Sequence, residues 1–162
     1  MRMICSTIVL AAWALWFGGM IALFIFVQVL FQSDRSLAVQ VGPKLFLAFE
    51  RYQLVLAPIA LVVTFLWRLL VPSRLIVALF GLLAVASVGV VVHASLITPR
   101  MEALRLAGQS ASPRFRALHG QSMMIYVGQA AMLAGTGFIM PAAIVATRRK
   151  APDTAPAKDS RA

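Results

Sequence analysis

Four long apolar runs make up most of this chain and restrict its fold more than any other feature. They cover residues 4–31, 52–71, 75–97 and 121–146, and Arg68 is the one formal charge inside them. Each run has about 20 residues or more, enough for an α-helix to cross ~30 Å of hydrocarbon. A soluble domain of 162 residues has no interior large enough for a chain that is 61% hydrophobic and patterned in this way. We therefore predict an all-α integral membrane protein, an antiparallel four-helix transmembrane bundle.

The segments between the runs predict short interfacial helices. A polar connection, residues 32–42, follows the first run, and Pro43 then begins an amphipathic lead-in to the second. Beyond the third run, the Thr98–Pro99 pair predicts a helix start, because threonine is a good cap and proline is tolerated in the first turn. Gly108 predicts the end of that helix, and Ser112–Pro113 repeats the start signal before the fourth run.

The charge of the chain is strongly basic, with a formal net charge of +10. The cations lie in loops and tails beside the apolar runs, so they predict contact with lipid headgroups and not binding of nucleic acid. We expect one transmembrane domain, residues 1–147, followed by a disordered basic tail, residues 148–162. The cluster of Arg148, Arg149 and Lys150 beside the fourth run favours cytoplasmic termini in a bacterial inner membrane.

Polar residues converge on the side of the membrane that holds the two longer loops. Glu50 precedes the second run there, and His93 lies near the end of the third. The last helix carries a polar stripe at i, i+3, i+7 and i+10, hence on one face: His119, Ser122, Tyr126 and Gln129. Such a stripe avoids lipid and predicts either a polar pocket or hydrogen bonds between helices. The candidate pocket or ligand residues are Glu50, His93, Arg100, Arg105, His119, Ser122, Tyr126 and Gln129.

Two histidines near one membrane face leave a haem b or copper site open. His93 and His119 are the candidate metal ligands, either as axial partners of a haem or together with a methionine on copper. The alternative is a solvated interfacial His119 and a His93 that bonds to a backbone carbonyl. The sequence contains no linear signature of a hydrolase triad, a P-loop or a zinc protease. We therefore expect no enzyme and name no catalytic residue.

Two stretches of the sequence carry a resemblance to a known family. Residues 98–105 read Thr-Pro-Arg-Met-Glu-Ala-Leu-Arg, and residues 115–122 read Phe-Arg-Ala-Leu-His-Gly-Gln-Ser. With an aromatic–glycine element at residues 16–19, they resemble bacterial membrane proteins of unknown function (domain of unknown function 4149), related to eukaryotic transmembrane protein 205. The likeness covers most of residues 10–135 and implies four spans without a settled activity. It implies family-type positions at Arg100, Arg105, His119 and Ser122, and Tyr126 stands where the family often has an Asn.

These features predict a small polytopic membrane protein of non-enzymatic function. Its polar pocket at the face of the two longer loops is expected to bind a small solute, an ion, a lipid headgroup or a partner. We expect the protein to lie in the lipid bilayer. Its further expected partner is a second copy of the same chain, in a homo-oligomer, or another membrane protein. Two alternatives stay open: a haem- or copper-handling protein that uses His93 and His119, and a structural subunit of a larger membrane complex.

Overall fold

The computed structural model describes residues 1–149, and the part of the chain that it describes contains helices and no strand. The helices are α1 (Arg2–Ser33), α2 (Arg35–Leu70), α3 (Arg74–Val92), the π-helical segment η1 (His93–Ile97), α4 (Thr98–Leu106) and α5 (Pro113–Arg149). Within the described residues, four helical stretches are long and apolar enough to cross a membrane. The predicted all-helical membrane fold is therefore confirmed. The predicted disordered tail over residues 148–162 is wrong at its first two residues, since Arg148 and Arg149 belong to α5, and its remainder, residues 150–162, lies outside the described part.

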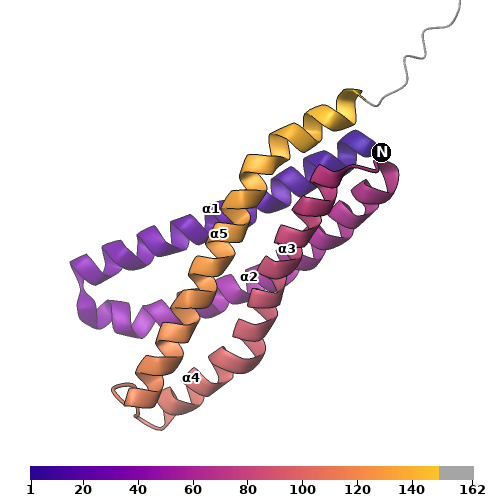
Figure 1. The fold of residues 1–162 in the computed structure, drawn as a ribbon. Coiled ribbons are helices and arrows are strands. Elements are labelled where there is room, and N and C mark those ends of the chain that lie inside the picture. Colours follow the sequence, from indigo (N-terminus) through magenta and orange to yellow (C-terminus); the bar gives the residue numbers. More distant parts are fainter. Residues whose placement is uncertain (150–162) are drawn as a thin grey trace, which may run out of the picture.

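The four long helices run antiparallel to their neighbours in the chain (Figure 1). The N-terminus, the turn from α2 to α3 and the end of α5 lie together at one end, and α4 lies at the other. Helix α1 packs against α2 and α5, and α3 packs against the same two helices. Every long helix thus contacts two others, and side chains from α2, α3 and α5 meet along their shared contacts.

A single residue separates the first two long helices, so the predicted polar connection over residues 32–42 is wrong. Asp34 has an extended backbone, and its Oδ1 accepts hydrogen bonds from the backbone N–H groups of Ser36 at 2.8 Å and Leu37 at 3.1 Å. These donors satisfy the first turn of α2, which begins at Arg35. The N–H of Leu37, followed by the donors of Ser36, lowers the pKa of Asp34. Pro43 consequently lies inside α2 and does not begin a helix.

The predicted start of α4 at Thr98, with Pro99 in its first turn, is confirmed, but Thr98 does not cap this helix, because the chain continues from α3 into α4 through one π-helical turn. The backbone N–H of Thr98 donates to the carbonyl of His93, an i→i+5 bond. Pro99 explains this turn, since a proline ring clashes with the carbonyl four residues earlier and has no N–H to offer it. The wider turn accommodates the ring without ending the helix.

The end of α4 and the start of α5 agree with the sequence prediction. Gly108 has a positive φ of 69°, and its N–H donates to Arg105 O at 3.0 Å while Gln109 N–H donates to Leu104 O at 2.8 Å. This pair of bonds is the Schellman motif, which closes a helix at a left-handed glycine. The hydroxyl of Ser112 then accepts the N–H of Phe115 at 3.1 Å and caps α5.

The molecule has a largely apolar core and an apolar exterior. The exposed large side chains include Phe26, Val88 and Phe138, spread over three of the long helices. An apolar outer surface suits lipid as the surrounding solvent, because there the backbone polar groups are already paired inside each helix. The core contains few charges and is built mainly from Val9, Trp16, Met20, Ala60, Trp67, Ile76, Leu79, Leu83, Leu133, Met140 and Ala143.

Two tryptophans take part in close helix packing toward the end of the bundle that holds the N-terminus. Trp13 Nε1 donates to the carbonyl of Leu133 at 2.7 Å, and a Cβ added to Gly137 would lie 2.5 Å from the ring of Trp13. Trp67 is fully buried, and its Nε1 donates to the hydroxyl of Thr147 at 3.2 Å. We call these five residues the tryptophan region.

Candidate functional site

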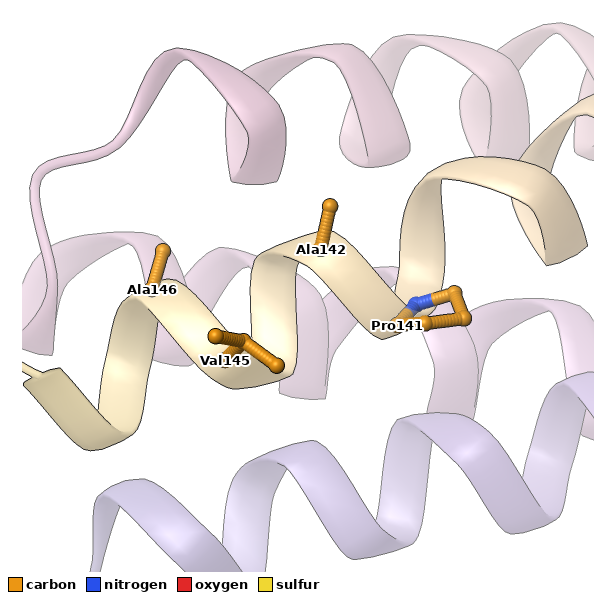
Figure 2. A pocket seen from close by; sticks show the side chains of 4 residues that line it. All are labelled: Pro141, Ala142, Val145 and Ala146. Carbon is orange, nitrogen blue, oxygen red and sulfur yellow. The ribbon is translucent and has the colours of Figure 1, made fainter.

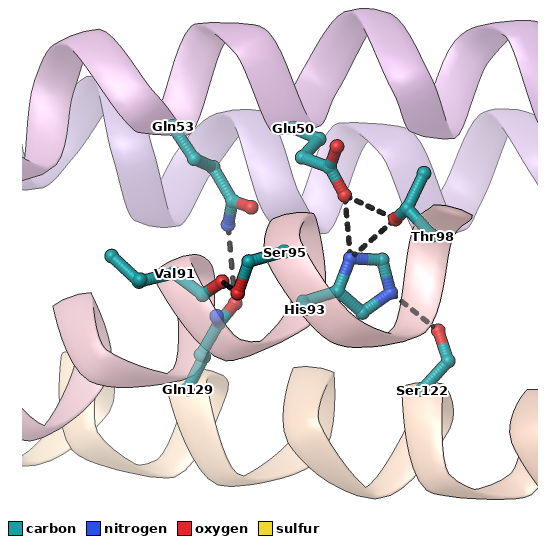
Figure 3. Close-up of polar contacts among 8 residues, drawn as sticks. All are labelled: Glu50, Gln53, Val91, His93, Ser95, Thr98, Ser122 and Gln129. Carbon is teal, nitrogen blue, oxygen red and sulfur yellow. Dashed lines mark hydrogen bonds and ion pairs between the residues drawn. The ribbon is translucent and has the colours of Figure 1, made fainter. Parts of the chain in front are cut away.

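A buried histidine joins three helices at the centre of the candidate site (Figure 3). His93 Nδ1 lies 2.7 Å from Oε2 of Glu50 on α2, and His93 Nε2 lies 2.7 Å from Oγ of Ser122 on α5. All three side chains are buried. Together with Thr98 and Tyr126, described below, they form what we call the polar cluster.

The π-helical turn brings a fourth polar group to Glu50. Thr98 Oγ1 donates to Oε2 of Glu50 at 2.5 Å and lies 3.2 Å from His93 Nδ1. In a regular α-helix, residues five apart point about 140° away from each other. The i→i+5 turn stacks Thr98 over His93 instead, so both side chains reach the same carboxylate oxygen (Figure 3). Such π-helical turns occur frequently at functional sites.

The hydrogen bonds of the cluster have a direction. An ionised carboxylate only accepts, so Nδ1–H of His93 donates to Glu50. In the neutral imidazole the other nitrogen is then an acceptor, and it takes the hydroxyl proton of Ser122. A continuous chain of donors therefore runs from Ser122 through His93 to Glu50.

Tyr126 completes the cluster and contains an unpaired polar atom. Its ring meets the ring of His93 edge-on, with centroids 4.9 Å apart, and it also packs against Phe24 and Phe46. The residue is 1% exposed, and its hydroxyl has no hydrogen-bond partner among the described residues. Buried polar atoms nearly always have a partner, so this donor requires an explanation.

A pair of hydrogen-bonded amide side chains lies next to the polar cluster (Figure 3). Gln53 Nε2 on α2 donates to Oε1 of Gln129 on α5 at 3.2 Å, and both side chains are buried. Gly89 on α3 makes room for this pair, because a Cβ there would lie 2.9 Å from Gln129 Nε2. Gly89 precedes His93 by one helical turn, so α3 approaches α5 closely beside the cluster.

The structure separates the other candidates from this group. His119 is exposed and stacks on Phe115 with ring centroids 6.5 Å apart. Arg105 pairs with Glu102 on α4, and Arg100 is exposed. In residues 1–149, no ion pair joins either arginine to Glu50, whose partner is His93. The polar stripe of α5 thus contributes Ser122, Tyr126 and Gln129 to the interior and leaves its first member outside.

Among the described residues, no observed contact joins His93 and His119, the two candidate metal ligands. Both ring nitrogens of His93 are engaged by Glu50 and Ser122, and His119 stacks on a phenylalanine. Over the described part of the chain, no group of three or more His, Cys, Asp or Glu side chains is placed to hold a metal ion. The haem or copper hypothesis therefore stays a prediction from the sequence.

Two participants were missed at the sequence level. The first is Thr98, which was interpreted as a helix cap. The proline after it is the signal that could have shown otherwise, because a proline can be accommodated by a π-helical turn inside a continuing helix as well as at a helix start. Gly89 is the second, and its close contact with the amide side chain of Gln129 has no sequence signal.

An open apolar hollow lies elsewhere, on the outer side of α5 (Figure 2). Pro141, Ala142, Val145 and Ala146 line it, all from the same helix. It contains no titratable side chain and faces the surroundings of the helix bundle, so it offers no chemistry comparable to that of the polar cluster.

Comparison with known proteins gives one match. A family model described as "Domain of unknown function (DUF4149)" matches residues 11–110, well over half of the chain. This chain belongs to the DUF4149 family. No curated protein and no solved structure matches it.

The family match divides the polar cluster of this DUF4149 protein. Glu50, His93 and Thr98 lie within the matched residues 11–110, whereas Ser122 and Tyr126 lie beyond them. The resemblance of residues 115–122 and the relation to transmembrane protein 205 therefore stay predictions. The family description names no activity, so function has to be argued from the geometry of the cluster.

Proposed function

We propose that this DUF4149 protein binds a lipid at the polar cluster. The part of the lipid that the cluster contacts is a small uncharged group next to the headgroup, and it bears a carbonyl. The observation that carries the proposal is the buried Tyr126 hydroxyl without a partner. In a cluster whose other groups are bonded to one another, this hydroxyl is the donor left for a ligand. A carbonyl oxygen is the simplest acceptor for it.

The charge of the cluster supports an uncharged ligand. Glu50 is a buried acid whose Oε2 is already bonded to His93 and Thr98. Adding a second negative charge beside it in a medium of low dielectric constant is unfavourable. A neutral carbonyl meets no such repulsion.

The position of the cluster along the helices supports a ligand from the lipid interface. His93 lies near the end of the apolar run 75–97, and Ser122 begins the run 121–146. Side chains at the ends of such runs lie near the boundary between hydrocarbon and headgroups. Lipid carbonyl groups lie at the same depth.

The setting of this site is a bacterial inner membrane with cytoplasmic termini, which we propose from the cluster of Arg148, Arg149 and Lys150. The polar cluster then faces the periplasmic side. Reporter domains fused after residue 162 and inserted next to Gly108 test this orientation. Activity of a cytoplasm-specific reporter at Gly108 would reverse it.

Photo-crosslinking tests the ligand site directly. The probe is a long-chain N-acylethanolamide with a diazirine in its acyl chain, because its amide carbonyl accepts a hydrogen bond and resists cleavage. We expect crosslinks to peptides of α3 and α5 around the polar cluster. Tyr126→Phe should reduce them about three- to ten-fold, as expected for one lost neutral hydrogen bond.

The chain contains a matched control for this substitution. Tyr52 is the only other tyrosine, and its hydroxyl donates to Leu15 O at 3.4 Å between α1 and α2. Tyr52→Phe should leave the crosslinks unchanged. An equal loss in both variants, or crosslinks spread evenly over all four helices, would contradict a site at Tyr126.

A further inference from the structure

We propose that Ser122 is a nucleophile for acyl transfer from a lipid ester, with His93 as its base and Tyr126 as the donor to the oxyanion. This inference rests on the proposed binding site and replaces the expectation of a non-enzymatic protein. Glu50 and Thr98 act through His93 and are positioning residues.

The first support is the order of contacts along the chain of hydrogen bonds. Ser122 Oγ and Glu50 Oε2 contact opposite nitrogens of His93, each at 2.7 Å. Nucleophile, base and orienting acid within about 2.6–3.2 Å of one another are the geometry that activates a serine hydroxyl. Thr98 fixes the same carboxylate oxygen and so restrains the imidazole in the required tautomer.

The second support is a donor for the negative charge that develops during acyl transfer. Ser122 lies inside α5, where the backbone N–H groups are used by the helix, so a backbone oxyanion hole is not available there. Tyr126 follows Ser122 by four residues and therefore lies on the same helical face. Its buried hydroxyl is unpaired, and tyrosine hydroxyls are among the side chains that stabilise such oxyanions.

The reaction balances with water as the only co-reactant. Ser122 Oγ attacks the ester carbonyl carbon while its proton moves to Nε2 of His93, and the carbonyl oxygen becomes an oxyanion that accepts from Tyr126. The carbon–oxygen bond to the alcohol breaks, and His93 gives its proton to the departing alkoxide. Water then attacks the acyl-serine, its proton moves through His93 back to Ser122 Oγ, and a carboxylic acid leaves.

Charge and depth identify the substrate class as the acyl ester of an anionic glycerophospholipid. The ends of the apolar runs put the cluster near the boundary between hydrocarbon and headgroups, where lipid esters are found. Arg100, Arg114 and Arg116 lie on the same side of the membrane and are exposed. Basic residues next to the membrane attract anionic lipid headgroups.

Covalent labelling tests the nucleophile. The full chain in detergent micelles is treated with an alkyl fluorophosphonate, and the adduct is located by peptide mass spectrometry. We expect one adduct, at Ser122, which Ser122→Ala abolishes. Ser87→Ala is the matched control, because Ser87 and Ser122 are both 7% exposed and Ser87 bonds only to its own helix, at Leu83 O.

Two conservative variants separate positioning from folding. Glu50→Gln retains a hydrogen-bonding group of the same shape but favours the wrong tautomer of His93, so labelling should slow about 10²- to 10⁴-fold. Tyr126→Phe should slow hydrolysis of phosphatidylglycerol in vesicles about 10²-fold. Both proteins should keep the unfolding midpoint of the wild type to within a few degrees.

Each outcome decides a different part of the inference. No adduct at Ser122 while the amide probe still crosslinks would overturn the nucleophile and leave the binding site intact. Equal labelling of Ser87 and Ser122 would also overturn it, because no activation by His93 is then present. Hydrolysis of ethyl acetate, a water-soluble ester with an alkoxide leaving group of similar reactivity, at the rate of phosphatidylglycerol or faster would overturn the lipid substrate and retain the nucleophile.

Discussion

The polar cluster and the tryptophan region both join α5 to other helices, yet they use different chemistry. In the tryptophan region, indole N–H groups donate to a carbonyl and a hydroxyl, and no titratable side chain takes part. In the polar cluster, a carboxylate and an imidazole are buried, the helix has a π-helical turn, and a hydroxyl is unpaired. Burial of such groups in a membrane protein is expensive.

This difference indicates which region is organised for function. Neutral hydrogen bonds between membrane helices contribute modestly to stability and serve packing. Ionisable groups at membrane depth cost more than they contribute, so their presence favours a site over a structural contact. Trp16 Nε1 is the other buried side-chain atom without a hydrogen-bond partner in residues 1–149. Trp16 and Tyr126 both belong to the hydrophobic core cluster, but Tyr126 also packs against the ring of His93.

The largest stability effect should come from removing the buried Glu50 carboxylate. Glu50→Ala leaves two buried donors, Nδ1–H of His93 and the hydroxyl of Thr98, without their acceptor and should destabilise the fold by about 2–6 kcal/mol, since each such donor costs about 1–3 kcal/mol. Glu102→Ala is the control, because its pair with Arg105 is exposed and such pairs contribute about 0–1 kcal/mol. Denaturant unfolding in detergent measures both. Equal losses would mean that the Glu50 pair behaves as a surface contact.

Overpacking of the tryptophan region should have the next largest effect. Gly137→Ala places a methyl group against Trp13 and should destabilise the protein by about 1–3 kcal/mol. Gly128→Ala, with open space at its Cβ position on the same helix, should stabilise it by about 0.5–1 kcal/mol. The same unfolding measurement compares them. Neither substitution should alter labelling of Ser122, since both lie outside the polar cluster.

A smaller effect is expected from the hydrogen bond between the uncharged side chains of Trp67 and Thr147. A double-mutant cycle of Trp67→Phe and Thr147→Val should give a coupling of about 0.6 kcal/mol. Gln53→Leu and Gln129→Leu provide the comparison near the cluster, with a coupling of the same size. A coupling several times larger in either pair would show that neutral bonds here carry more than packing.

The smallest effect should come from His119. His119→Ala removes an exposed ring and should change the free energy of unfolding by less than about 0.5 kcal/mol and labelling of Ser122 not at all. A reduced-minus-oxidised visible spectrum of the wild type tests the haem hypothesis, and metal analysis tests copper. A Soret band or stoichiometric copper that disappears in both His93→Ala and His119→Ala would reverse our assignment of these residues.

Much of the fold could be predicted because membrane spans depend on composition alone. Four apolar runs correspond to four helices, since length and hydropathy determine which segments can cross a bilayer. The helix ends were less predictable. Asp34 begins a helix through side-chain bonds to the backbone, and the helix then continues through Pro43, which composition does not reveal.

The candidate site was predicted in part. The convergence of Glu50, His93 and Ser122 followed from the side of the membrane on which each apolar run begins or ends. Their hydrogen bonds did not, because a chain of contacts between residues far apart in sequence has no linear signature. Thr98 was missed for a local reason, since its position depends on a π-helical turn that reverses the expected helical face.

The π-helical turn also has a consequence for how such a site can arise or disappear. An i→i+5 turn holds one more residue than the α-helical turn that it replaces. Deletion of Ala94 would put Thr98 four residues after His93, about 40° away on the same face of a regular helix, but it would set the Pro99 ring against the carbonyl four residues before it. One codon therefore separates a helix that passes through this proline without a kink from one that is kinked beside the buried carboxylate.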